Sequence, residues 1–159
     1  MIEFLPLLQP PRWRANILVQ WKQVKVGQHA LKPGSYMPTK KIMVVDDSRT
    51  LREAVATELR AAGYEVSEAA DGREALEMLN AERFDLVICD VIMPVMDGIA
   101  FVKEARKRPD CRFLPIVMLT TEAGERRRQE GQMAGAKAWV VKPFRPQQIL
   151  HVVSKLVMP

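Results

Sequence analysis

Residues with the chemistry to bind a metal ion and a phosphoryl group follow short apolar segments of this chain. They are three carboxylates, a hydroxyl and an amine: Asp46, Asp47, Asp90, Thr120 and Lys142. Clustered carboxylates repel one another unless a cation balances them, and a hard divalent ion with oxygen ligands would do so. Mg²⁺ suits this role because it binds through one or two carboxylates and leaves coordination positions for water or a phosphoryl oxygen. The amine and the hydroxyl can pair with or donate to phosphoryl oxygens.

The segments that must position these residues alternate between short apolar runs and longer amphipathic stretches from residue 40 onward. This alternation is typical of repeated βα units around a parallel sheet. The expected strands lie at 42–45, 64–69, 86–89, 115–119 and 138–141. Ligands of an open parallel sheet bind beyond the carboxyl ends of its strands, where all five polar residues stand. A single aspartate there is usually a helix cap or a turn former, but the joint placement favours a functional site.

Apolar residues at helical spacing separate the expected strands. They are Leu51, Val55 and Leu59; Ala75 and Leu79; Ile99, Val102 and Ala105; and Ile149, Val153 and Leu156. Asp71 with Glu74 is a variant of the capping box, and Pro146 suits a first helical turn. The segment 122–134 is the weakest expected helix, because its charged run leaves few apolar positions.

The charge of the chain is concentrated at its beginning. The formal net charge is +5, and the first 38 residues contain five basic residues against one acidic residue, so 39–159 is nearly neutral. We therefore expect no nucleic-acid footprint on the main domain. Residues 1–38 are expected to be an extension, either disordered or produced by a miscalled start codon, and 39–159 the folded domain. An alternation of apolar residues over 17–26 is read as a stray strand outside the core.

Cysteine content and hydropathy indicate the compartment. Cys89 and Cys111 are too few for a disulfide framework, and Cys89 is expected to be a small core residue. No apolar stretch approaches the roughly 18 residues that a membrane span requires. The first residues lack the pattern of a signal peptide. We therefore expect a soluble, cytoplasmic protein with no membrane partner.

Four segments of the chain resemble the receiver domain of response regulators. They are KKIMVVDDSRTLREAV, DVIMPVMDG around Asp90, LTTEA and VVKPF, and the resemblance covers residues 40–157. The stretch from RFLPIVMLTTEA to VVKPF is most similar to single-domain chemotaxis proteins of the CheY kind. The resemblance implies a flavodoxin-like (βα)5 fold, a three-layer sandwich whose parallel strands have the order 2-1-3-4-5.

The resemblance also implies a role for each polar residue at the predicted edge. Asp90 would accept a phosphoryl group from the phosphohistidine of a sensor histidine kinase. Asp47, Asp90 and the backbone carbonyl of Ile92 would bind Mg²⁺ directly, and Asp46 would orient the ion through water. The remaining phosphoryl oxygens would be held by Lys142 and Thr120. Positioning and charge neutralisation suffice for phosphoryl transfer, so no separate general base is needed.

The resemblance also implies a conformational switch in which Thr120 senses phosphorylation and the aromatic residue of the last strand responds. Thr120 would move toward the phosphoryl group, and Trp139 would move into the space it leaves. Tyr or Phe is usual at this position, so the bulkier Trp139 is a departure, and a purely structural role in the core is the alternative. The Lys142-Pro143 peptide is expected to be cis, and Pro94 and Gly98 are expected to shape the loop after Asp90.

The output is expected to be a contact with another protein, because the chain ends just past the last expected helix. A flagellar motor switch in chemotaxis, a phosphatase, a phosphate sink and a phosphorelay intermediate are all compatible with the residues, and the chemotaxis-like stretch favours the first. The basic run at 126–128 is either a solvated face or a surface for an acidic partner.

Three other classes of protein share some of these residues but fit the sequence less well. A phosphatase with an aspartate nucleophile also uses magnesium, but it needs substrate-binding insertions that the short loops leave no room for. A nucleotide- or flavin-binding module would need a glycine-rich loop after the first strand, where Asp46 and Asp47 stand instead. A receiver-shaped protein that is never phosphorylated would not need the complete acidic, hydroxyl and lysine set. We therefore expect a signalling protein and not an enzyme with a separate substrate.

Overall fold

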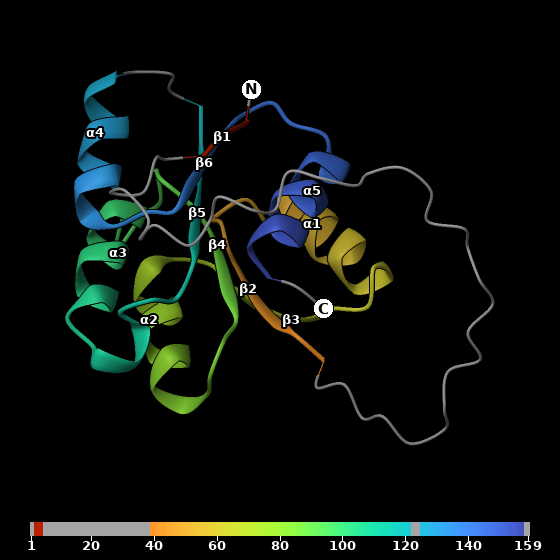
Figure 1. Ribbon diagram of the computed structural model, residues 1–159, viewed down its shortest axis with the longest axis horizontal. Coiled ribbons are helices and arrows are strands. Elements are labelled where there is room, and N and C mark those ends of the chain that lie inside the picture. The colour runs from red at the N-terminus through yellow and green to blue at the C-terminus, as the bar shows by residue number, and fades with distance from the viewer. Residues whose placement is uncertain (1, 5–38, 122–124, 158–159) are drawn as a thin grey trace, which may run out of the picture. The chain divides into compact units, whose positions relative to one another are not determined.

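The structure is a computed structural model that describes residues 2–4, 39–121 and 125–157. A central sheet carries helices on both of its faces, which makes three layers (Figure 1). The five strands that the sequence predicts all form, each overlapping its expected range. The expected stray strand over 17–26 lies outside the described residues.

The sheet contains six strands within the described part of the chain. Their bounds are β1 Ile2–Phe4, β2 Lys41–Val45, β3 Glu65–Ala69, β4 Leu86–Asp90, β5 Ile116–Thr120 and β6 Ala138–Val141. The spatial order is β1-β6-β5-β4-β2-β3, and β2 to β6 pair in parallel. Counted from β2, this is the order 2-1-3-4-5, so the flavodoxin-like topology is confirmed.

The strand β1 was not anticipated from the sequence. It pairs antiparallel with β6, and Ile2, Glu3 and Phe4 lie opposite Val140, Trp139 and Ala138. A strand of three residues is too short to show an alternating pattern of its own. β1 covers the edge of the sheet that β6 would otherwise form.

The helices divide between the two faces of the sheet. Their bounds are α1 Arg49–Ala61, α2 Gly72–Ala81, α3 Gly98–Arg106, α4 Glu125–Ala134 and α5 Pro146–Leu156. Figure 1 shows α1 and α5 on one side and α2, α3 and α4 on the other. Alternate residues of each strand point to opposite faces, so Ile42 and Val44 pack under α1 and α5 while Met43 and Val45 belong to the other core.

Helix caps follow the local sequence. Ser48 caps α1 and Asp97 caps α3, through side-chain oxygens that accept from backbone amides. The expected capping box of α2 is present, because Asp71 accepts from the Glu74 amide while Glu74 accepts from the Ala70 amide at 2.7 Å. The caps start α1 and α2 within a few residues of the preceding strand, whereas a loop of seven residues separates β4 from α3.

Arg106 joins the end of α3 to the segments that lead into β5 and β6. Its guanidinium donates to the carbonyls of Cys111 at 2.5 Å, Leu114 at 2.8 Å and Gly135 at 2.9 Å. Burial lowers the pKa of Arg106, although an arginine keeps its charge. Gly135 has φ +102°, a left-handed conformation that favours glycine just after α4. Arg106 therefore fixes the carboxyl end of α4 beside α3.

Candidate functional site

The predicted polar residues meet at the carboxyl edge of the parallel sheet. Asp46 and Asp47 follow β2, Asp90 ends β4 and Thr120 ends β5. Each of the three aspartates offers an oxygen, and these oxygens lie within 4.8 Å of one another. Fixed carboxylates at such distances destabilise one another unless a cation lies among or beside them. The sequence-based expectation that these residues form one cluster is met by the geometry.

Lys142 supplies a cation to this cluster from the segment after β6. Its Nζ lies 2.8 Å from Asp46 Oδ2 and 3.0 Å from Asp90 Oδ1. Burial alone would lower the pKa of Lys142, but the hydrogen bonds to the two carboxylates outweigh burial and raise that pKa. The ammonium is therefore charged at neutral pH. The Lys142-Pro143 peptide is cis, as the resemblance implied.

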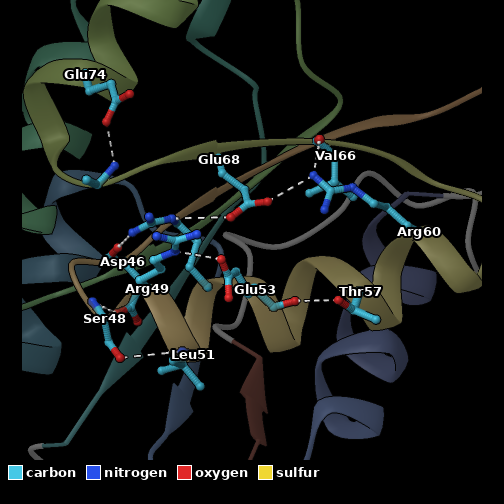
Figure 2. Close-up of polar contacts among 12 residues, drawn as sticks. Asp46, Ser48, Arg49, Leu51, Glu53, Thr57, Arg60, Val66, Glu68 and Glu74 are labelled. Atoms are coloured by element: carbon cyan, nitrogen blue, oxygen red, sulfur yellow. Dashed lines mark hydrogen bonds and ion pairs between the residues drawn. The ribbon is translucent and has the colours of Figure 1, made fainter.

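Asp46 has contacts on both carboxylate oxygens and on its backbone carbonyl. Oδ1 accepts from the Ser48 amide at 2.8 Å, and Oδ2 accepts from Lys142. The carbonyl accepts from Arg52 Nη1 at 2.6 Å. Figure 2 shows Asp46 beside Ser48 at the start of α1. Asp46 is 1% exposed, so it is held from several sides, whereas the neighbouring Asp47 is exposed.

Asp90 is a nearly buried carboxylate that remains accessible at the surface of the cluster, with 6% of its residue exposed. Burial raises the pKa of Asp90, while its hydrogen bond to Lys142 acts in the opposite direction. The loop after β4 folds back onto this residue, and the Gly98 amide donates to the Val91 carbonyl at 3.0 Å. A Cβ on Gly98 would overlap the Asp90 carbonyl oxygen and lie 3.0 Å from its carbonyl carbon. Gly98 therefore has the loop-shaping position that was expected of it.

The residue whose carbonyl was expected to bind Mg²⁺, Ile92, lies in the same loop, two positions after Asp90. Its side chain is 47% exposed, which is unusual for isoleucine and places this loop at the solvent boundary of the cluster. The roles of Ile92 and of the other site residues remain expectations, which the geometry permits.

Thr120 and Trp139 lie on neighbouring strands, and both are buried, at 1% and 3% exposure. The indole of Trp139 belongs to the core that β5 and β6 share with α3. A Cβ on Gly131 of α4 would overlap Cζ3 of the indole and lie 3.0 Å from Cη2. Trp139 thus packs closely against α4, and this packing requires a residue without a side chain at position 131.

Sequence reasoning missed Arg52, Glu68 and Gly131. Arg52 stands three residues before the buried Val55, which is the spacing that places both on the same side of α1. That spacing was the available signal for a basic residue near the cluster. The partner on β3 and the close approach of α4 to Trp139 are tertiary contacts with no counterpart in local sequence.

Two further expectations concern surfaces. Arg126 is highly exposed and pairs with Glu130 at 3.4 Å, as a residue of a solvated helix face would. Within the described residues, no helix combines the length and the apolar character needed to cross a membrane.

Comparisons with known proteins agree with the geometry. The family model for the response regulator receiver domain matches residues 42–154. A probable transcriptional regulator ycf27 of Cyanophora paradoxa is 44% identical over 118 residues, which cover 74% of this chain and 48% of that protein. The chain thus spans about half the length of the curated relatives that it matches.

Solved structures supply two further likenesses. The chemotaxis protein CheY4 of Vibrio cholerae is 47% identical, with a TM-score of 0.72, and the match covers 75% of this chain and 99% of that one. The receiver domain of the sensor histidine kinase PA1611 of Pseudomonas aeruginosa is 28% identical, with a TM-score of 0.69, over 74% of this chain and 97% of that one. That structure is described as having a magnesium ion coordinated in the active site cleft.

Proposed function

Because the chain belongs to the response regulator receiver domain family, we propose that Asp90 accepts a phosphoryl group from the phosphohistidine of a sensor histidine kinase. The observation that carries this proposal is the Asp90 carboxylate itself, which lies 3.0 Å from the Lys142 ammonium within a cluster of three aspartates. An Asp90 oxygen attacks phosphorus, the P–N bond breaks, and the bonding electron pair goes to the imidazole nitrogen, whose ring is protonated at its other nitrogen. The product is an aspartyl phosphate on this chain and a neutral histidine on the kinase.

The side chains around Asp90 are suited to hold the transferred group. Lys142 already bridges Asp46 and Asp90, so its ammonium can follow the negative charge from the carboxylate onto a phosphoryl oxygen. Thr120 ends the neighbouring strand and brings a hydroxyl that can donate to another oxygen. Positioning of this kind accounts for most of what a protein contributes to phosphoryl transfer.

The donor set fits Mg²⁺. We propose that Asp47, Asp90 and the Ile92 carbonyl hold the ion directly and that Asp46 acts through water. Support comes from Asp46, whose two carboxylate oxygens are engaged by Ser48 and Lys142, while Asp47 is exposed beside it. When bound, Mg²⁺ neutralises the carboxylates and the charge on the phosphoryl oxygens.

Phosphorylation is proposed to act through Thr120 and Trp139. It adds about 1.5 to 2 negative charges and three acceptor oxygens at Asp90, a local change large enough to bias a two-state element. The Thr120 hydroxyl responds to the phosphoryl group, and the Trp139 indole reports the change to α4, against which it packs. The partner then reads the altered surface by direct contact.

Chemotaxis is the first output that we propose, with a flagellar motor switch or a phosphatase as the partner protein. Its support is the likeness to CheY4, which extends over nearly the whole of that chain. The second candidate is control of transcription, favoured by the identity to the ycf27 regulator. In either case we propose a cytoplasmic signalling protein that turns over no separate substrate. A phosphate sink or phosphorelay intermediate is the remaining receiver role.

Uptake of phosphate from acetyl phosphate tests the proposal. Intact-mass measurement should detect one added phosphoryl group when Mg²⁺ is present and none when it is chelated. Asp90→Asn should abolish the addition, while Glu53→Gln, at an exposed carboxylate of α1, should leave it unchanged. Labelling of Asp90→Asn at the rate of the unmodified chain would refute the assignment. Sustained release of phosphate from a small phosphomonoester would favour the phosphatase alternative.

Capture of partners by the beryllofluoride-treated chain separates the two outputs. Enrichment of a motor-switch protein or phosphatase over the Asp90→Asn control would support chemotaxis. Enrichment of a transcription complex or of DNA would support the second candidate.

A further inference from the structure

Arg52 links three elements immediately behind the acidic cluster. It lies on α1, and its Nη1 donates to the Asp46 carbonyl at 2.6 Å. Its Nε lies 3.4 Å from Glu68 Oε2 on β3, in an ion pair whose side chains are only 15% and 25% exposed. This Nε is buried and makes no hydrogen bond to any residue that the structure describes, so the carboxylate of Glu68 compensates its charge. One guanidinium thus holds the end of β2 to both α1 and β3.

Glu68 is held in turn by a second arginine of the same helix. Arg60 Nη2 donates to Glu68 Oε1 at 3.0 Å and to the Val66 carbonyl at 3.0 Å. Figure 2 shows Glu68 lying between Arg60 and the segment that carries Asp46. Because each carboxylate oxygen of Glu68 contacts a different arginine, the side chain has little freedom to release Arg52. The chain of contacts runs from Asp46 through Arg52 and Glu68 to Arg60.

The contact between Arg52 and Asp46 involves the backbone and not the carboxylate. Arginine usually pairs with carboxylates through its planar fork, and such a pairing here would neutralise part of the acidic cluster. Glu68 pairs with Nε of the guanidinium instead, while Nη1 of the same guanidinium donates to the Asp46 carbonyl. That carbonyl belongs to the peptide between Asp46 and Asp47. The orientation of that peptide determines where the exposed Asp47 side chain can point.

We propose that Arg52, held by Glu68, is a positioning residue for the divalent-cation site. It fixes the peptide between Asp46 and Asp47, so that the Asp47 carboxylate is presented to the ion while its charge remains available. This inference rests on the proposed function, because it concerns the same site. Loss of a group that orients a metal ligand commonly weakens metal affinity by about 10–100-fold.

Isothermal titration of the full chain with MgCl₂ tests the inference through Arg52→Met, which keeps an apolar stem and removes every donor. We expect magnesium affinity to fall about tenfold, the lower end of the range for residues that orient metal ligands. A purely long-range charge effect predicts the opposite sign, because removal of a cation near three carboxylates strengthens cation binding. Arg49→Met removes the same charge from an exposed residue of α1 that pairs with Glu53 and not with Glu68, so its magnesium affinity should not fall.

Arg52→Lys separates positioning from charge. It retains the charge, but a single ammonium does not span the Asp46 carbonyl and Glu68 as a guanidinium does, so affinity should fall between those of the unmodified chain and Arg52→Met. Unchanged or stronger binding in both Arg52 variants would overturn the inference. If Arg52→Met does not fold, Arg52→Lys decides by the same criterion. Failure of the unmodified chain to bind Mg²⁺ would instead contradict the proposed function itself.

Discussion

Gly131 packs closely against Trp139, so the effect of Gly131→Ala on the free energy of unfolding should depend on which residue stands at position 139. In the structure, a methyl group at position 131 would overlap Cζ3 of the indole and lie 3.0 Å from Cη2. Carbon atoms normally approach to about 3.5–4.0 Å. Trp139 is 3% exposed and belongs to the hydrophobic core on this face of the sheet, so movement of the ring would disturb packed neighbours. Gly131→Ala must therefore displace either α4 or the ring.

Two opposing terms set the size of the effect on the free energy of unfolding. Alanine stabilises a helix interior by about 1 kcal/mol relative to glycine. Insertion of a methyl group into a well-packed core costs about 1–3 kcal/mol, and the overlap here places the cost near the upper limit. We expect Gly131→Ala to lower the free energy of unfolding by about 1–2 kcal/mol, the difference between these terms.

The same substitution should have the opposite effect once the large ring is removed. In a Trp139→Leu background the helix preference of alanine remains while the overlap disappears, so Gly131→Ala should stabilise the chain by up to about 1 kcal/mol. Urea unfolding followed by circular dichroism gives all four free energies of the double-mutant cycle. Gln132→Gly and Gln132→Ala, at the exposed neighbouring position of α4, together measure the effect of replacing glycine with alanine in this helix away from the ring.

An equal loss of stability from Gly131→Ala in both backgrounds would refute the reasoning. It would mean that the cost arises within α4 and not from contact with the indole. If Gly131→Ala stabilised the chain that keeps Trp139, the indole ring would have to lie elsewhere in solution.

Three further predictions concern Asp90, Arg106 and Trp139. Asp90→Asn should raise the urea midpoint at neutral pH, and the gain should shrink on acidification: burial raises the pKa of Asp90, so its charged form costs stability above that pKa and the cost disappears as the carboxylate protonates. Equal urea midpoints for Asp90→Asn and the unmodified chain at neutral pH would contradict this stability cost of the Asp90 charge. Arg106→Met should lower the free energy of unfolding by about 3 kcal/mol, because three carbonyls lose their donor; a loss below about 1 kcal/mol would show that water replaces the guanidinium. Trp139→Ala should leave phosphoryl uptake by Asp90 intact and weaken capture of the partner by the beryllofluoride form, and unchanged capture would argue against a switch role.

The acidic cluster was predictable because its members are defined by their place in the sequence. Asp46, Asp90, Thr120 and Lys142 each stand at or just after the end of a strand, and parallel pairing brings those ends to one edge. No side-chain detail is needed for that step. The parallel strands were predictable for a similar reason, since strands buried on both faces are nearly continuous apolar runs.

Contacts between elements were not predictable in the same way. Arg52 and Glu68 are separated by a turn and lie on different elements, and nothing in either local sequence specifies that they pair. In the sequence, Gly131 is only a residue of low helix preference within a charged helix. The structure shows why glycine stands there, because a Cβ at position 131 would overlap the indole of Trp139. β1 is too short for periodicity to reveal, and its pairing depends on an edge formed more than a hundred residues later in the chain.

The short strand β1 also has a consequence for self-association. An open sheet edge presents unpaired amide and carbonyl groups, which can template pairing with another chain. On the β3 edge, the exposed Glu65 places a charge that discourages such pairing. The β6 edge carries the apolar sequence Ala138–Val141 and has β1 along it instead. Removal of Ile2–Phe4 would take away this cover, and two copies of the chain could then join their sheets more readily through β6.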